Sequence, residues 1–363
     1  MLNYYIAYSI MTLSALWLNR GKKSLNIKNK HTYCIVFSII WTILLGLRHP
    51  SMGVDLVATS EYGYIGQYNL IQTLSLKDAF LNSVQNYEHG YVIFCKLIGY
   101  ISSDPQWLVF CCATVSMICV CLLISKNSEL PFLSSIIYLG LPVFLITYSG
   151  LRQSLAISIT LLSFDLIKRK KLFCFILTVL LAALFHSSAI IFLVAYPAYH
   201  IKLSKWMQIA TMLILPTTFI LRVPLFNLLS KILKDNAQVD NNGSITLFII
   251  FSAIYIFIVM FNNYNDAEFN GLRNIYFLAC FCQAFSAAFY NAMRVGYYFM
   301  IYLVILLPKL ILDRYNSTET FESKRTGLII YLLIFVCFFA YGLNSIANAS
   351  WAMSNPHFFF WEV

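Results

Sequence analysis

Five side chains of this sequence have the chemistry to bind an anionic group and to move a proton. They are Arg48, Glu88, Arg152, His186 and Arg294. The planar guanidinium of arginine can hold a phosphate through two parallel N–H bonds. A histidine or a carboxylate can accept a proton at near-neutral pH when its surroundings favour this. Together they suit a diphosphate leaving group and a hydroxyl that must lose its proton.

Each of these residues also has a simpler explanation. Arg48 follows an apolar run and Arg152 begins another, so either could be an interfacial anchor. Arg152 stands in the first turn of an expected helix, where the helix dipole disfavours a cation, and a bound polyanion would resolve that conflict. His186 lies at the tip of an expected hairpin over 171–200, where it could instead hydrogen-bond a neighbouring helix.

The composition identifies the elements that must position these side chains. Of the 363 residues, 60% are apolar and 11% are charged, against about 45–50% and about 25% in soluble domains. Repeated apolar runs therefore predict an all-α, polytopic membrane protein. The net charge of +10 comes largely from short basic clusters between these runs, as in cytoplasmic loops, so we expect no nucleic-acid partner.

Other classes of function lack their signatures. The sequence contains no phosphate-binding Gly-Lys-Ser/Thr loop, no Gly-x-Ser-x-Gly elbow and no His-Glu-x-x-His motif. ATP-driven transport and serine or zinc proteolysis are therefore unsupported. The ten cysteines include no Cys-x-x-Cys pair and lie mainly in apolar runs, so we expect no metal site.

Hydropathy and the positive-inside rule predict about twelve spans and one short re-entrant or outer-leaflet helix at 90–103. The spans are 3–19, 32–47, 106–124, 130–148, 151–167, 171–184, 187–200, 206–222, 245–262, 273–290, 295–310 and 327–343. The whole chain, 1–363, forms a single membrane domain with outer loops 48–105 and 223–244. The five chemical residues and Asp55 then all fall on the outer side, which indicates one polar cavity opening outward.

Both outer loops contain patterns typical of helices lying along the membrane surface. Ser75 and Asp78 match a capping box, and Leu76, Phe80 and Val84 follow at helical spacing. The second loop carries an amphipathic stretch of five residues. They are Leu225, Leu228, Leu229, Ile232 and Leu233.

An ordered set of short motifs resembles the EpsG-like branch of the Wzy polysaccharide polymerases. The motifs are Gly46-x-Arg48 with Gly53-x-Asp55, Glu88-x-Gly90-Tyr91, Leu151-Arg152-Gln153-x-x-Ala156, Ala182-Ala183-Leu184-Phe185-His186-Ser187-Ser188, and Arg294 with Tyr298-Phe299. They follow one another across residues 46–299, which is most of the chain. One departure is the gap of several residues between Asp55 and the tyrosines Tyr62 and Tyr64.

The resemblance implies a GT-C-like, metal-independent glycosyltransferase without a cofactor. Such enzymes join oligosaccharides carried on undecaprenyl diphosphate at the outer face of the bacterial cytoplasmic membrane. The products are O-antigen, capsule or exopolysaccharide. Flippase and chain-length regulator proteins are further expected partners besides the lipid bilayer.

Together with this resemblance, the chemistry of the candidate residues predicts a role for each of them. Arg48, Arg152 and Arg294 would hold lipid diphosphates, and His186 is favoured over Glu88 as the base. Four further residues would contact sugar or support the site. They are Asp55, Tyr91, Gln153 and Tyr298. Two other functions remain open: a polysaccharide flippase or transporter, and a membrane O-acyltransferase that modifies surface glycan.

Overall fold

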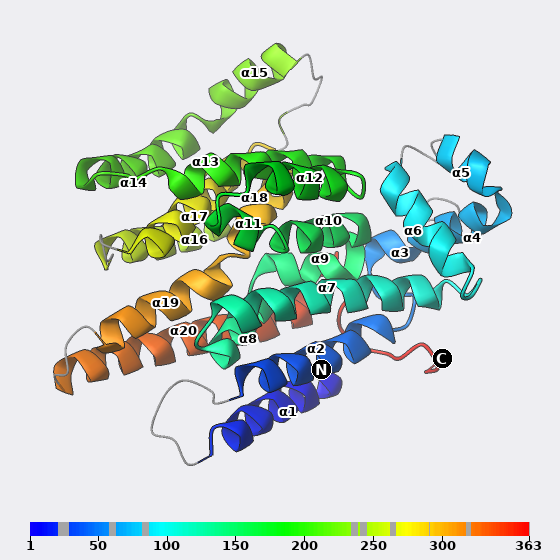
Figure 1. Ribbon diagram of the computed structural model, residues 1–363, viewed down its shortest axis with the longest axis horizontal. Helices are drawn as coiled ribbons and strands as arrows, with labels where there is room; N and C mark the ends of the chain where they lie inside the picture. Colours follow the sequence, from blue (N-terminus) through cyan, green and yellow to red (C-terminus); the bar gives the residue numbers. More distant parts are fainter. Residues whose placement is uncertain are drawn as a thin grey trace. The chain divides into compact units, whose positions relative to one another are not determined.

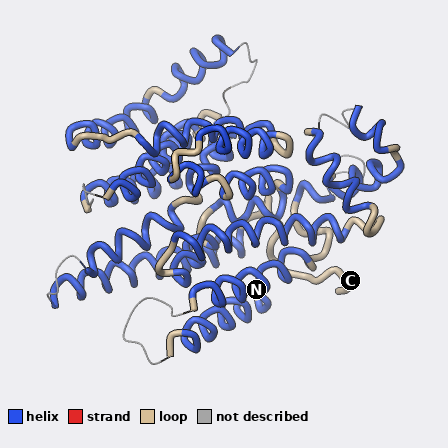
Figure 2. Tube along the Cα trace, viewed as in Figure 1, coloured by secondary structure: helices blue, strands red, loops and turns tan. Residues whose placement is uncertain are grey.

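The computed structural model describes residues 1–20, 29–57, 63–81, 87–233, 239, 245–261, 266–289, 291–316 and 321–362. Every regular element within these ranges is a helix (Figures 1 and 2). The all-α prediction is therefore confirmed for this part of the chain. Tyr62 and Val84 lie outside the described residues.

The chain divides into two compact units, Met1–Ile190 with Tyr331–Val363, and Ile191–Ile330. The single membrane domain over 1–363 stays a prediction, and we describe the units separately. The helices of the first unit are α1 (Leu2–Leu18), α2 (Lys30–Gly46), α3 (Val54–Val57), α4 (Tyr64–Thr73), α5 (Leu76–Leu81), α6 (His89–Gly99), α7 (Gln106–Asn127), α8 (Pro131–Leu139), α9 (Pro142–Ser149), α10 (Leu151–Leu161), α11 (Phe164–Lys168) and α12 (Leu172–Ala183).

The second unit contains α13 (Ala195–His200), α14 (Lys205–Ile220), α15 (Arg222–Leu233), α16 (Ile245–Met260), α17 (Ala267–Phe285), α18 (Asn291–Met300) and α19 (Leu303–Asn316). The 3₁₀ helix η2 (Ser187–Val194) and α20 (Phe321–Asn348) cross the boundary between the units. In the second unit α17 packs against α13, α14, α16 and α18.

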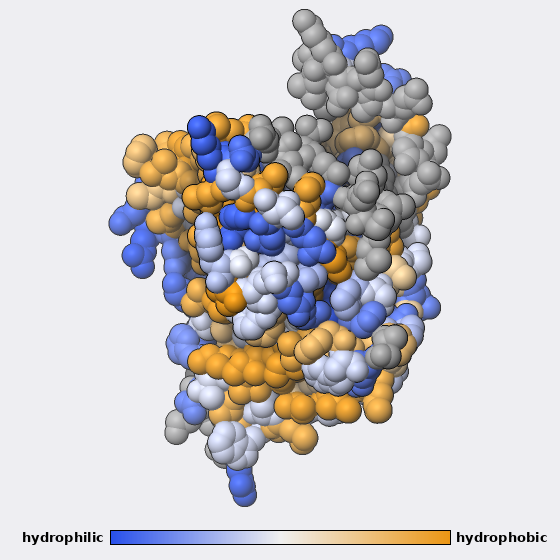
Figure 3. Space-filling view, turned by 90° about the vertical axis from the view of Figure 1, so that its right-hand side faces the viewer, coloured by the Kyte–Doolittle hydropathy of each residue, from blue (hydrophilic) through white to orange (hydrophobic). Residues whose placement is uncertain are grey.

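Two described helices, Gln106–Asn127 and Glu322–Asn348, are long and apolar enough to cross a membrane. Three bent pairs raise that number to five if each pair is one span: α8 with α9, α14 with α15, and α18 with α19. The twelve-span topology is therefore not confirmed, and the GT-C-like architecture stays a prediction. Figure 3 shows one face on which broad hydrophobic areas lie beside a hydrophilic patch.

One break within the predicted spans has a clear local cause. The run 130–148 divides into α8 and α9, which meet at an angle of 60°, because Pro142 starts a new helix and cannot continue the preceding one. The helix expected at 90–103 is present as α6 and has 11 residues, about half the length that a span requires.

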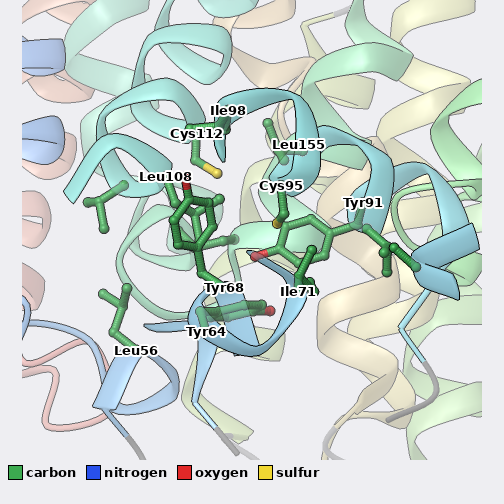
Figure 4. Close-up of a cluster of buried hydrophobic side chains, with 14 residues drawn as sticks. Leu56, Tyr64, Tyr68, Ile71, Tyr91, Cys95, Ile98, Leu108, Cys112 and Leu155 are labelled. Carbon is green, nitrogen blue, oxygen red and sulfur yellow. The ribbon is translucent and has the colours of Figure 1, made fainter. Parts of the chain in front are cut away.

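The helices of the loop 48–105 share a buried core with α7 and α10. Figure 4 shows Tyr64 and Tyr68 of α4 and Tyr91 of α6 turned toward one another, close to Cys95 and Cys112. These side chains are almost fully buried. The loop is therefore a packed part of the first unit, and its core fixes where the beginning of α6 lies.

Helices are present at both positions where surface helices were predicted, α5 and α15. The Asp78 backbone N–H donates to Ser75 Oγ at 3.0 Å, and Ser75 Oγ donates to Asp78 Oδ2 at 2.6 Å. Ser75 therefore caps the start of α5 as predicted, while the Asp78 carboxylate accepts from the Ser75 hydroxyl and not from its backbone N–H as in a complete capping box. The amphipathic stretch of the second loop lies in α15.

The C-terminal segment, residues 349–362, runs back across the ends of α2 and α9. The Phe360 backbone N–H donates to Leu47 O at 2.9 Å, and the His49 backbone N–H donates to Phe358 O at 2.8 Å. Ser149 Oγ donates to Trp351 O at 2.7 Å. This segment therefore connects the C-terminal ends of α2 and α9, which precede Arg48 and Arg152 in the chain.

Candidate functional site

The structure brings together Glu88, Arg152 and His186, three of the predicted residues. Glu88 Oε2 accepts a hydrogen bond from Arg152 Nη1 at 2.5 Å. Glu88 Oε1 lies 3.2 Å from His186 Nδ1 and accepts a hydrogen bond from the Ser187 backbone N–H at 2.9 Å. We call Glu88, Arg152, His186 and the Ser187 N–H the Glu88 cluster.

Close packing of α6 against the end of α12 builds this cluster. A Cβ atom at Gly90 would lie 2.7 Å from both Leu184 Cβ and Leu184 O, so a side chain there would push the two helices apart. The Tyr91 backbone N–H donates to Leu184 O at 3.2 Å. His186 follows two residues later, and the turn places its ring beside Glu88. Glycine at position 90 therefore permits the contact between Glu88 and His186.

Aromatic rings line the arginine side of the cluster. The Arg152 Cζ atom lies 4.2 Å from the centroid of the Tyr87 ring, within the range of a cation–π contact. Arg152 also hydrogen-bonds Tyr64. The rings of Tyr64 and Tyr91 lie 6.1 and 5.7 Å from that of Tyr87. These contacts hold the guanidinium in one orientation.

Sequence reasoning missed Tyr87, although it stands directly before Glu88. One tyrosine among 24 in an aromatic-rich chain carries no distinguishing pattern. Only the fold reveals that its ring covers Arg152. The Ser187 backbone N–H was equally invisible, because every non-proline residue has one.

The surroundings of Glu88 keep its carboxylate ionised. Burial raises its pKa, but the hydrogen bonds from His186 and the Ser187 N–H and the charge of Arg152 lower it to about 2. An ionised carboxylate can only accept hydrogen bonds, so His186 Nδ1 must carry the proton that joins the pair. A neutral His186 ring then has its lone pair on Nε2, which bonds to nothing in the described part of the chain.

Arg48 lies elsewhere, with its side chain 1% exposed. Its guanidinium donates to Leu45 O at 2.6 Å, to Met52 O at 3.3 Å, and to Thr147 O and Tyr148 O at 3.1 and 3.0 Å. These carbonyls belong to the ends of α2 and α9 and to the turn after α2. The structure thus gives Arg48 a set of backbone partners, and diphosphate binding by Arg48 stays an untested prediction.

The remaining predicted residues occupy three different settings. Asp55 is half-buried on α3 and acts electrostatically on Tyr64 and Tyr87, at the aromatic side of the Glu88 cluster. Tyr91 and Gln153 are buried inside the first unit, at 1% and 2% exposure. Arg294 and Tyr298 lie on α18 of the second unit, where Tyr298 is fully buried and Arg294 is half-buried. Their roles toward a substrate stay predictions.

The family model of EpsG matches residues 31–359, about nine-tenths of the chain. The chain belongs to the EpsG family. The family assignment and the apolar helices agree with a membrane protein of polysaccharide biosynthesis. The matched range contains the Glu88 cluster and every other predicted site residue. No curated protein and no solved structure matches the chain.

Within the described ranges, no three His, Cys, Asp or Glu side chains of this EpsG-family protein group as a metal site would need. The Glu88 cluster itself contains one carboxylate and one imidazole, and His186 Nδ1 is hydrogen-bonded to Glu88 Oε1. Its chemistry is therefore that of an oriented imidazole beside a guanidinium.

Proposed function

We propose that this protein is a repeat-unit polymerase with its reaction centre at the Glu88 cluster. It would transfer a growing saccharide from undecaprenyl diphosphate to a hydroxyl of an incoming lipid-linked unit, at the outer face of the bacterial cytoplasmic membrane. Membership of the EpsG family supports the reaction class. The observation that carries the choice of site is the contact of Glu88 with both Arg152 and His186.

In this mechanism His186 is the general base. Its Nε2 removes the proton from the acceptor hydroxyl while that oxygen attacks the anomeric carbon of the donor. The bond from the anomeric carbon to the diphosphate oxygen breaks, and the lipid diphosphate leaves with the electron pair. The proton ends on His186 and passes to solvent or to the departing diphosphate. Because a diphosphate is already a good leaving group, we expect the reaction to need no metal.

Glu88 acts as a positioning residue and not as the base. A carboxylate with a pKa of about 2 is a weak base, and both of its oxygens already accept hydrogen bonds. It fixes the tautomer of His186 and favours the imidazolium that forms during proton transfer, as in an acid–base–nucleophile triad. This reasoning strengthens the preference for His186 over Glu88.

Arg152 supplies positive charge for the diphosphate. A guanidinium has five N–H donors. The bonds of Arg152 to Glu88 and Tyr64 use part of them, and its Nε is buried. The remaining donors can bind phosphate oxygens while the pair with Glu88 holds the group in place. The same proposal assigns Arg294 to the second lipid diphosphate. Flippase and chain-length regulator proteins are the expected partners of the protein.

A deletion strain tests the proposal against its alternatives. A polymerase defect removes the long-chain ladder of surface glycan and leaves single repeat units. Loss of all surface glycan would instead indicate a flippase or transporter. An unchanged ladder with altered acylation would indicate an O-acyltransferase. Polymerisation of purified lipid-linked units by the purified protein, with and without EDTA, then tests the reaction and its independence of metal directly.

A further inference from the structure

Two of the ten cysteines, Cys34 of α2 and Cys121 of α7, contact each other within the first unit. Their thiols are hydrogen-bonded to each other. Both cysteines are in the thiol form, and neither belongs to the Glu88 cluster. A contacting pair of thiols has a chemistry that a lone buried cysteine lacks, because oxidation can join the two sulfur atoms.

The packing of α2 against α7 supports this contact independently (Figure 1). On one side of the two cysteines, a Cβ atom at Gly46 would lie 2.9 Å from Phe110 Cδ2 and 3.1 Å from Phe110 Cα. On the other side, Lys30 Nζ lies 2.8 Å from Glu129 Oε1. The two cysteines lie between these contacts along antiparallel chain segments, so the register brings them together. A disulfide requires such a close approach, with Cα atoms about 4.4–6.8 Å apart.

The two thiols differ in exposure, which gives them different roles toward an oxidant. Cys34 is fully buried, at 0% exposure, whereas Cys121 is half-buried. A small oxidant therefore reaches Cys121 first. Cys95 and Cys112 also lie close together, in the core that Figure 4 shows, but at 0% and 2% exposure neither presents an exposed sulfur. Contact together with exposure thus distinguishes the pair of Cys34 and Cys121.

We propose that Cys34 and Cys121 form an oxidation site, at which hydrogen peroxide closes a disulfide between α2 and α7. The Cys121 sulfur attacks the peroxide, the O–O bond breaks, and the products are a sulfenic acid on Cys121 and one water. The Cys34 sulfur then attacks the Cys121 sulfur, the S–S bond forms, and the sulfenic hydroxyl leaves with the Cys34 proton as a second water. The two thiols lose two electrons in total, and the peroxide gains them.

The predicted topology gives this site a setting. Both cysteines lie toward the predicted cytoplasmic ends of their helices, and cytoplasmic thiols keep cysteines reduced. The dithiol is then the resting form, and the disulfide forms when peroxide is in excess. A dithiol reductant reverses the step by thiol–disulfide exchange. The chemistry of the pair is independent of the proposed polymerase reaction.

Peptide mapping by mass spectrometry tests the site on the purified full-length protein. In the parent protein for this test the exposed cysteines Cys174 and Cys337 are replaced by serine, so that they cannot link different molecules. After treatment with hydrogen peroxide and alkylation of the remaining thiols, we expect a disulfide-linked peptide pair containing Cys34 and Cys121, which dithiothreitol separates. The link should also raise the temperature of thermal unfolding, because it restricts the unfolded chain.

Serine variants separate the two roles. In Cys34→Ser, dimedone should trap the sulfenic acid on Cys121, whereas in Cys121→Ser we expect Cys34 to stay unlabelled. Cys119→Ser is the matched control, because Cys119 lies on the same helix at 6% exposure, and the disulfide should form in it as in the parent.

Three results would overturn the proposal. They are full alkylation of both Cys34 and Cys121 after peroxide, a disulfide that joins a different pair of cysteines, and dimedone labelling of Cys34 in Cys121→Ser. The first two are measured on the parent protein itself, so the test stands even where a serine variant fails to fold.

Discussion

Replacing Glu88 with glutamine removes one charge at the centre of the Glu88 cluster and keeps the size of the side chain. The pKa of Glu88 falls from 4.5 to about 2, and at about 1.4 kcal/mol per pKa unit this corresponds to about 3 kcal/mol at most. The side chains of Glu88 and Arg152 retain 16% and 21% exposure, so solvent screening lowers the expected cost to about 2 kcal/mol.

The same numbers predict the pH dependence of stability. Because the pKa of Glu88 is lower in the folded chain, its ionised form stabilises the fold above its ordinary value of 4.5. That contribution is lost as the pH falls from 4.5 toward about 2. Thermal unfolding of the purified protein across this range should show the loss in the wild type and a smaller one in Glu88→Gln.

Activity should fall more steeply than stability. Without the carboxylate, His186 is no longer held in the tautomer that leaves Nε2 free, so we expect at least about a 100-fold lower rate of polymerisation in vitro. Glu129→Gln is the matched control, because Glu129 pairs with Lys30 at 2.8 Å while 58% exposed. Its loss should cost less than about 1 kcal/mol and leave the rate unchanged.

Two results would refute this reasoning. Wild-type turnover in folded Glu88→Gln would show that Glu88 does not orient the base. Near-normal turnover in His186→Gln, combined with an inactive Glu88→Gln, would make Glu88 the base and His186 a packing or hydrogen-bonding residue. A double-mutant cycle of Glu88→Gln with Arg152→Ala would further measure the coupling of the pair, which should exceed about 0.5 kcal/mol.

Three other substitutions test the assignments around the cluster. Gly90→Ala should cost about 2 kcal/mol through its clash with Leu184, and thermal unfolding and polymerisation should both decline. Arg152→Lys keeps the charge but loses the fork, so the in vitro rate should fall about 100-fold and the Michaelis constant for the lipid donor should rise. Arg48→Lys cannot replace four bonds to backbone carbonyls and should lower stability by about 3 kcal/mol. If Arg48 acts only through these bonds, the donor Michaelis constant of the folded fraction should not change, and a raised constant at unchanged stability would support the predicted diphosphate role.

The positions of several helices could be predicted from the sequence, because apolar runs or capping residues mark them. Apolar runs predicted the positions of α1, α2 and α7, and Ser75 with Asp78 predicted the start of α5. The breaks were harder to predict. Pro142 marks the division of 130–148, whereas the break after α10 at Leu161 coincides with no proline or glycine. Hydropathy carries no signal for such a break.

For the candidate site residues, too, the sequence predicts some features and not others. The residue type shows that a partner is needed, but it does not show which partner. An ionisable side chain among apolar helices must find a partner, so the grouping of Glu88, Arg152 and His186 could be anticipated from their rarity and from the side of the membrane predicted for all three. Arg48 satisfies the same requirement with carbonyls, two of which lie 99 and 100 residues away in the chain. Nothing in the sequence distinguishes an arginine that will meet a carboxylate from one that will meet the end of a helix. The distinction matters for the proposed function, because Arg152 lies beside His186 in the Glu88 cluster, whereas Arg48 donates four hydrogen bonds to carbonyls at and near the ends of α2 and α9. In the proposed mechanism, therefore, the partner of each arginine suggests the test: Arg152 should affect donor binding, and Arg48 should affect stability.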